Sequence, residues 1–163
     1  MPSTHALYLL LGANLGDRTA TFDRAAHQIG ERIGPVIQQS NRYETAPWGV
    51  TDQPPFLNQV LAVETGLPPE DVLAQTQAIE QELGRVRHEK WGARRIDIDI
   101  LYYDQLVRQT ATLVIPHPHL HQRRFTLVPL ADVAPELVHP LLGKTTLELL
   151  AECADDGTVT PFK

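Results

Sequence analysis

An isoleucine–aspartate repeat stands out in the second half of the chain. Three isoleucines alternate with two aspartates in the order Ile96, Asp97, Ile98, Asp99, Ile100. This is the period of a β-strand with one buried face, and it places both carboxylates on the other face, roughly 6.5–7 Å apart. Carboxylates at that spacing can share hard divalent cations, and Mg²⁺ binds through one or two carboxylates together with substrate phosphates. An amphipathic strand with a solvated face has the same pattern. The flanking residues are therefore needed to choose between a metal site and a solvated face.

A basic segment directly precedes the two aspartates. Residues 85–95 hold five basic side chains and one acid, a local net charge of +4. Trp91, in the middle of this segment, offers an aromatic face for stacking. Arginine guanidinium groups make paired contacts with phosphate oxygens. Cations beside a carboxylate pair are typical of a site for a polyphosphate and its metal ions. We therefore favour this interpretation over a solvated loop.

A second group of candidates lies around a proline- and glycine-rich loop over residues 45–55. Trp48 in this loop could cap an apolar ring, or it could pack the loop against the protein. Asn58 follows on a predicted strand, and its amide carries donors and an acceptor that match the mixed polar edge of a heterocycle. Taken alone, an asparagine on a strand is usually a surface residue.

Three histidines at alternate positions form a third group, at His117, His119 and His121. On a continuous strand they would share one face and could bind zinc, but Pro118 interrupts that geometry. We favour one of these histidines acting with an arginine of the following Arg123–Arg124 pair on a triphosphate.

Hydrophobic periodicity and turn residues predict the elements that position these groups. Strands are expected over 6–12, 36–43, 56–65 and 95–103. Long helices are expected from Asp17 to the Gly34–Pro35 stop and from Pro68–Pro69 to Gly84. A short hairpin is expected over 104–115, with short helices over 124–133 and 145–154. The core order is βαββαβ, which predicts an α+β protein with a ferredoxin-like antiparallel sheet and helices packed on it.

Length, net charge and cysteine content exclude several classes of protein. The chain has 163 residues, which fits a single domain over 1–163. Its net charge of −6 argues against a general nucleic-acid binder. Cys153 is the only cysteine, so an intrachain disulfide is excluded. No apolar run near the start is long enough for a signal peptide or a membrane span, and a cytoplasmic protein without membrane contact is expected.

The sequence resembles the 6-hydroxymethyl-7,8-dihydropterin pyrophosphokinases of folate biosynthesis. The resemblance rests on the signature KWGARRIDIDIL over residues 90–101 and extends over nearly the whole chain except about the last twenty residues. Further matching motifs are GANLGD over 12–17, the loop over 43–49, residues 53–58, GRVR over 84–87, and a proline-, histidine- and arginine-containing stretch over 116–135.

The resemblance implies a three-layer α-β-α fold and transfer of pyrophosphate from ATP to the hydroxymethyl oxygen of the pterin, with release of AMP. The partners of the chain would be these two small molecules, and a monomer is expected. Asp97 and Asp99 would hold two Mg²⁺ ions that bridge the phosphates. Arg85 and Arg94 would contact the phosphates and assist the transition state.

The same matching motifs imply which residues line the two substrate sites. The ATP side would be formed by Gln77, Glu80, Arg87, Trp91, Ile100, His117 and Arg123. The pterin side would be formed by Thr45, Ala46, Trp48, Phe56, Asn58 and Phe125.

One alternative from another class is an RNA-binding module, since the same strand order serves sheet-surface RNA readers. Such modules need aromatic and basic residues on the central strands. Here the best candidate strand carries Asp97 and Asp99, which would repel phosphate in the absence of metal.

Overall fold

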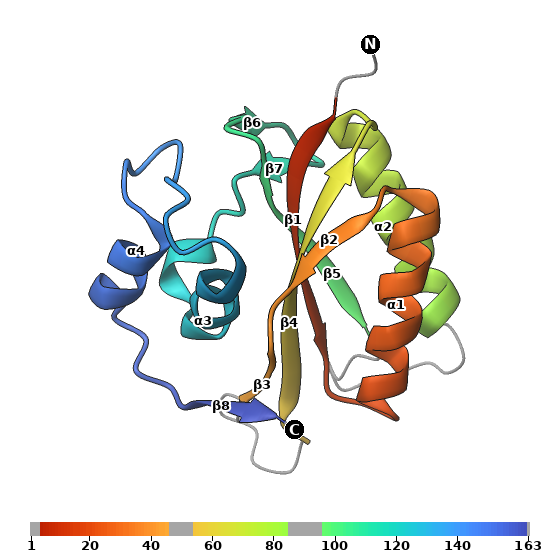
Figure 1. Cartoon of the computed structure of the whole chain (residues 1–163), viewed down its shortest axis with the longest axis horizontal. Coiled ribbons are helices and arrows are strands. Elements are labelled where there is room, and N and C mark those ends of the chain that lie inside the picture. The colour runs from red at the N-terminus through yellow and green to blue at the C-terminus, as the bar shows by residue number, and fades with distance from the viewer. Residues whose placement is uncertain (1–3, 46–53, 85–95, 163) are drawn as a thin grey trace.

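The strand closest to the N-terminus runs through the interior of an antiparallel sheet (Figure 1). The computed structural model describes residues 4–45, 54–84 and 96–162. Its elements are, in chain order, β1 His5–Ala13, α1 Arg18–Arg32, β2 Val36–Gln39, β3 Arg42–Thr45, β4 Phe56–Thr65, α2 Pro69–Gly84, β5 Asp97–Tyr103, β6 Arg108–Gln109, β7 Val114–Ile115, a short 3-10 helix Leu120–Gln122, α3 Arg124–Val133, α4 Thr146–Glu152 and β8 Val159–Phe162.

The main sheet has the strand order β5-β1-β4-β3-β8, and β2 also pairs with β4. The pairings between these strands are antiparallel. The central strand β1 pairs with β4 along the whole length of β1, from His5 opposite Thr65 to Ala13 opposite Leu57. The small hairpin of β6 and β7 forms a second sheet.

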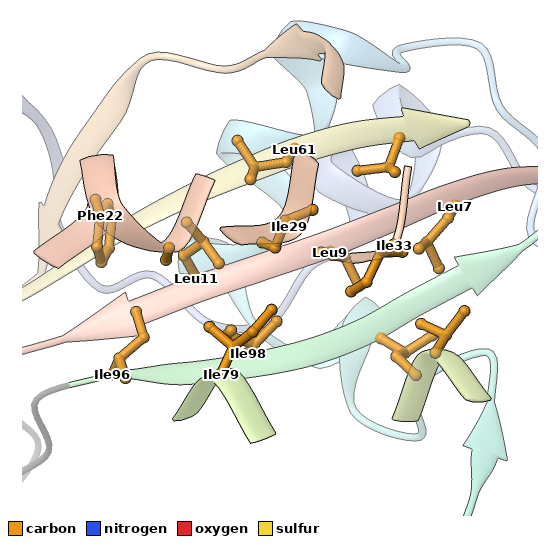
Figure 2. Close-up of a cluster of buried hydrophobic side chains, with 14 of the residues drawn as sticks. Leu7, Leu9, Leu11, Phe22, Ile29, Ile33, Leu61, Ile79, Ile96 and Ile98 are labelled. Carbon is orange, nitrogen blue, oxygen red and sulfur yellow. The ribbon is translucent and has the colours of Figure 1, made fainter. Parts of the chain in front are cut away.

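Two hydrophobic clusters fill the space on the two faces of the sheet. The first lies between the sheet and the helices α1 and α2, where Leu7, Leu9 and Leu11 alternate along β1 (Figure 2). The second lies between the sheet and α3 and α4. Its buried members are Leu10, Val60, Leu101, Tyr102, Leu120, Leu127, Leu130, Ala134 and Leu149. Both faces are therefore covered by helices, with α1 and α2 on one side and α3 and α4 on the other (Figure 1).

These layers confirm the predicted α+β class. The βαββαβ core is ferredoxin-like, the sheet is antiparallel, and the helices form a three-layer α-β-α arrangement. Of the helices in the described part of the chain, none combines the length and the apolar composition needed to cross a bilayer.

The predicted alternation in β5 is also confirmed. Ile96, Ile98 and Ile100 are buried in the cluster under α1 and α2. Asp97 and Asp99 point to the opposite face, on which α3 lies, because successive strand residues alternate sides. The pairing of β5 with β1 shifts register between Tyr8 and Leu9. The part of β5 with alternating isoleucine and aspartate ends at this shift.

The structure differs from the predicted elements at two places. The strand predicted over 36–43 is divided into β2 and β3. Ser40 lies between them, and both its backbone N–H and its hydroxyl bond to Val60, each at 2.9 Å. The other difference is β8, a four-residue edge strand beside β3 that has no strong hydrophobic pattern and contains Pro161. Proline is tolerated there because an edge strand leaves one side unpaired.

His139 lies buried in the connection between α3 and α4. Its side-chain Nδ1 accepts hydrogen bonds from the backbone N–H groups of Leu141 and Leu142, at 3.1 and 3.2 Å. The ring packs edge-on against Tyr102, and the ring of His121 is 6.1 Å away. Burial lowers the pKa of His139 below its ordinary value, and the neighbouring His121 lowers it further. The folded state therefore favours the neutral imidazole.

This lowered pKa predicts acid destabilisation. In the unfolded chain His139 titrates near 6.5, so below that pH the unfolded state binds more protons and the free energy of unfolding falls. The loss continues until His139 also titrates in the folded state. Urea unfolding at a series of pH values should show a smaller loss for His139→Asn, whose amide oxygen can replace Nδ1 as acceptor. Equal pH dependence in the two proteins would contradict this assignment.

Candidate active site

Residues from four neighbouring strands form one row across the sheet, called the polar row here after its side chains Asp97, Asn58 and Tyr43. Asp97 of β5 is opposite Gly12 of β1, Gly12 is opposite Asn58 of β4, and Asn58 is opposite Tyr43 of β3. Directly opposed residues in antiparallel strands present their side chains on the same face. The hydroxyl of Tyr43 donates to Asp132 of α3 at 2.7 Å, so this is the α3 face.

Asp99 lies next to Asp97 on the same face and close to a histidine. Nε2 of His117 is 4.0 Å from a carboxylate oxygen of Asp99, whose side chain is 41% exposed. The backbone N–H of His117 donates to the carbonyl of Leu101 at 3.0 Å, which fastens the residue to the end of β5. The structure thus brings together two residues that are eighteen positions apart in the sequence.

The hydrogen bonds of His117 determine its tautomer. Its Nδ1 accepts from the backbone N–H of His119 at 3.1 Å, so a neutral ring carries its proton on Nε2, the atom that faces Asp99. Burial lowers the pKa of His117, and the charges of Arg123 and His119 lower it further, while Asp99 acts in the opposite direction. His117 therefore presents an N–H donor, which suits an anionic oxygen.

Arg123 and Phe125 lie at the start of α3. The guanidinium carbon of Arg123 is 5.6 Å from the centre of the Phe125 ring, which is a cation–π contact. Arg123 also acts on the charge state of His117. These contacts place a cation beside the Asp99–His117 pair, and they place Phe125 next to that cation at the edge of the second cluster.

Thr45, Phe56 and Asn58 form the other end of the site. Phe56 is opposite Thr45, two positions from the pair of Asn58 and Tyr43, so these side chains share the α3 face. The hydroxyl of Thr45 donates to the Asn58 amide oxygen at 3.1 Å. Asn58 is only 4% exposed. A buried amide held in this way offers a fixed polar edge.

Three residues expected on the ATP side lie on α2 or on the edge strand β5. The Glu80 carboxylate on α2 accepts the backbone N–H of Ile98 at 2.6 Å. Gln77 lies on the same helix, three positions earlier, and is exposed. The side chain of Ile100 is buried in the first cluster. A contact between Ile100 and a nucleotide would therefore come from its main chain.

Six of the expected site residues lie outside the described part of the chain. They are Ala46, Trp48, Arg85, Arg87, Trp91 and Arg94. The ends of their segments are described. Thr45 precedes the first segment, and the second connects the end of α2 at Gly84 to Ile96, next to Asp97. The described residues Thr45 and Asp97, which border these segments, belong to or adjoin the polar row.

The acidic pair fits a hard divalent cation. Asp97 and Asp99 supply carboxylate oxygens from alternate positions of one strand face, and both are partly exposed. Within residues 4–45, 54–84 and 96–162, no three His, Cys, Asp or Glu side chains are grouped so as to hold a metal ion. A pair of carboxylates that leaves further positions to water and phosphate is the way in which Mg²⁺ is commonly bound.

Sequence reasoning missed two contributors to this site. Gly12 appears in the sequence only as the first residue of the GANLGD motif, although in the fold it lies between Asp97 and Asn58. Asp132 accepts hydrogen bonds from the Tyr43 hydroxyl and from the backbone N–H of Asn41, at 2.7 and 3.1 Å. It thereby ties α3 to β3. Neither role has a local signal, because each depends on strand register or on contacts across about 90 residues.

Comparison with known proteins gives a consistent result. A family model described as 7,8-dihydro-6-hydroxymethylpterin-pyrophosphokinase matches residues 8–135. A 2-amino-4-hydroxy-6-hydroxymethyldihydropteridine pyrophosphokinase of Methylorubrum extorquens is 43% identical over 151 residues, covering 92% of this chain and 94% of the relative. The protein of the same name from Aquifex aeolicus is 38% identical over 156 residues, covering 96% of this chain and 94% of the relative.

Solved structures agree in fold. A Plasmodium falciparum HPPK-DHPS structure with pteroate superimposes with a TM-score of 0.77 over 92% of this chain, at 17% identity. The chain spans 44% of that longer protein, and at this identity the likeness concerns the fold alone.

The fold has three layers, α-β-α, and one face of its sheet carries a carboxylate pair and a buried amide. This arrangement is suited to a nucleotide-dependent transferase. The chain belongs to the 7,8-dihydro-6-hydroxymethylpterin-pyrophosphokinase family. It is accordingly an enzyme of the pyrophosphokinase class, and this assignment favours the catalytic interpretation over the RNA-binding alternative.

Proposed function

We propose that the chain transfers pyrophosphate from ATP to 6-hydroxymethyl-7,8-dihydropterin on the α3 face of its sheet. The observation that carries this proposal is the row of Asp97, Gly12 and Asn58, which puts an acidic pair and a buried amide at two ends of one surface. One end suits the metal-bound phosphates, and the other suits the polar edge of a ring. The family membership supports the same reaction.

The chemistry requires attack at the β-phosphorus of ATP. The hydroxymethyl oxygen of the pterin forms a bond to that phosphorus and loses its proton, while the bond between the β-phosphorus and the bridging α-oxygen breaks. AMP leaves with the bridging oxygen and its electron pair. Negative charge spreads over the phosphate oxygens in the transition state, so positioning and charge stabilisation supply most of the catalysis.

Asp97 and Asp99 are the residues that would hold two Mg²⁺ ions with the phosphates. When bound, such ions neutralise phosphate charge and align the reacting groups. On this proposal His117 donates its Nε2 proton in a hydrogen bond to a phosphate oxygen, and Arg123 adds a positive charge beside it. Arg85 and Arg94 act on the phosphates during transfer, and Gln77, Glu80, Arg87, Trp91 and the Ile100 main chain complete the ATP side.

On the pterin side, Asn58 would pair with the polar edge of the ring, and Thr45 would hold the Asn58 amide in one orientation. Phe56 and Phe125 would supply the apolar faces for stacking. Ala46 and Trp48 would border the ring from the segment that follows Thr45.

We further propose that residues 1–163 act as one domain and as a monomer in the cytoplasm. The described residues of the site all come from a single chain, from β1, β3, β4, β5, α2, α3 and the segment before it. No second copy is needed to supply these described residues.

The reaction can be tested by following AMP release from ATP while omitting one component at a time. We expect release only when ATP, Mg²⁺ and the hydroxymethyl-dihydropterin are all present, because the pterin oxygen is the nucleophile. Release that continues without the pterin would identify an ATP hydrolase instead. Release that survives removal of divalent ions by a chelator would contradict the role of Asp97 and Asp99.

A further inference from the structure

Gly12 lies in the floor of the site, at a position where a side chain would point between the acidic pair and the buried amide. It is opposite Asp97 on one neighbouring strand and opposite Asn58 on the other. Leu10, two residues earlier, points to the same face and is buried in the second cluster. A residue at position 12 would therefore present its side chain to the site.

The space above Gly12 is taken up by one group. A Cβ atom built on Gly12 would lie 3.1 Å from Nδ2 of Asn58, and within the described parts of the chain no other atom is within 4 Å, apart from its own chain neighbours. The Asn58 amide group therefore packs directly against the backbone of β1. Its Nδ2 donates to the Leu11 carbonyl at 3.5 Å, while its oxygen accepts from the Thr45 hydroxyl at 3.1 Å.

A methyl group at this position would displace the amide. Contacts at 3.1 Å are tighter than ordinary van der Waals separation, so the neighbour has to move. Leu11 O and Asp97 belong to the paired strands, whereas the Asn58 amide can rotate about its side-chain bonds. The displacement would weaken one or both of the bonds to Thr45 and Leu11, and it would raise the amide toward the ligand.

We propose that Gly12 is a positioning residue that sets the height and orientation of the Asn58 amide for recognition of the pterin edge. This inference rests on the proposed function for the identity of the ligand. The lack of a side chain at position 12 thus contributes to the selection of the substrate. A planar heterocycle with alternating donors and acceptors is the class of ligand that such a fixed amide recognises.

The test compares Gly12→Ala with Gly30→Ala. Gly30 is an exposed residue of α1 with no atom within 4 Å of its added Cβ in the described chain, so it is a matched control for the same chemical change. Binding of 6-hydroxymethylpterin is measured directly by fluorescence, and KM is measured for each substrate. We expect Gly12→Ala to weaken pterin binding about tenfold, with the KM for ATP within about twofold of the unaltered protein.

A double-mutant cycle separates positioning from a general loss of structure. In an Asn58→Ala background the group that the Gly12 methyl would meet is absent. The added methyl should then change pterin binding by less than about twofold. Far-ultraviolet circular dichroism and thermal unfolding of each variant give the fraction folded, by which each binding capacity is normalised.

Each outcome bears on a different part of the argument. Unchanged pterin binding in Gly12→Ala would overturn the positioning role, as would a full tenfold effect that persists in the Asn58→Ala background. A parallel rise in both substrate constants would also overturn it, since that is the mark of a general distortion. If the unaltered protein binds the pterin but releases no AMP, the proposed function fails while the binding test of Gly12 still stands.

Discussion

Replacing Asp97 or Asp99 by alanine is expected to lower kcat/KM for AMP release about a thousandfold. Each carboxylate lies on the polar face of β5, with its neighbours Ile98 and Ile100 buried on the other face. Loss of either carboxylate removes a ligand for the cations that offset the charge on the transferred phosphates. The fold should be retained, because neither aspartate is part of a hydrophobic cluster.

The matched control is Asp156→Ala, an exposed carboxylate in the segment before β8. It makes the same change in charge and should leave AMP release unaltered. Steady-state kinetics with Mg²⁺ titration measure the effect, and thermal unfolding shows that the variants are folded. Near-normal turnover in either Asp97→Ala or Asp99→Ala would remove that residue from the proposed metal site.

Gly34→Ala is expected to lower the free energy of unfolding by about 3 kcal/mol. Gly34 follows α1, and a Cβ atom there would lie 1.9 Å from the carbonyl oxygen of Glu64 near the end of β4. This oxygen is a backbone atom and cannot rotate away as a side chain could. The Glu64 residue is held in place because its N–H donates to the Pro35 carbonyl at 3.1 Å. The methyl group can be accommodated only by moving α1 away from the sheet.

Gly30→Ala again provides the comparison, since Gly30 lies in α1, the helix that Gly34 follows, and no described atom is within 4 Å of an added Cβ. There alanine should raise the free energy of unfolding by about 0.5–1 kcal/mol, because it is the better helix former. Urea unfolding of both variants measures the difference. Equal stability of Gly34→Ala and the unaltered protein would show that the α1–β4 junction adjusts at little cost.

The parts of the fold with strong local periodicity could be predicted from the sequence. The strand over 56–65 was predicted with the bounds that β4 has, and the alternation of Ile96 to Ile100 assigned the two aspartates to one face. A strict two-residue period admits only one assignment of faces when one face is buried. The helix cover on both faces of the sheet was implied by the family resemblance, since the order of elements predicted only that helices pack on the sheet.

What could not be predicted depends on long-range pairing. Gly12 acquires its meaning only when β1 pairs with β4 and β5 in one particular register. β8 is held by pairing with β3 and by the Arg18 guanidinium over the Phe162 ring, 5.1 Å from its centre. Such contacts produce no periodic pattern of hydrophobic and polar residues in the sequence. The contacts of Arg85, Arg94 and Trp48 stay predictions, since these residues lie outside the described parts.

Phosphorus NMR of a single reaction mixture tests the central claim most directly, because it identifies which bond of ATP is broken. With ATP, Mg²⁺ and the hydroxymethyl-dihydropterin present, we expect AMP and a pterin diphosphate ester to accumulate in equal amounts. Attack at the β-phosphorus with AMP as the leaving group gives these two products in a 1:1 ratio. Formation of ADP with a pterin monophosphate, or of AMP with free pyrophosphate, would contradict diphosphate transfer by this protein.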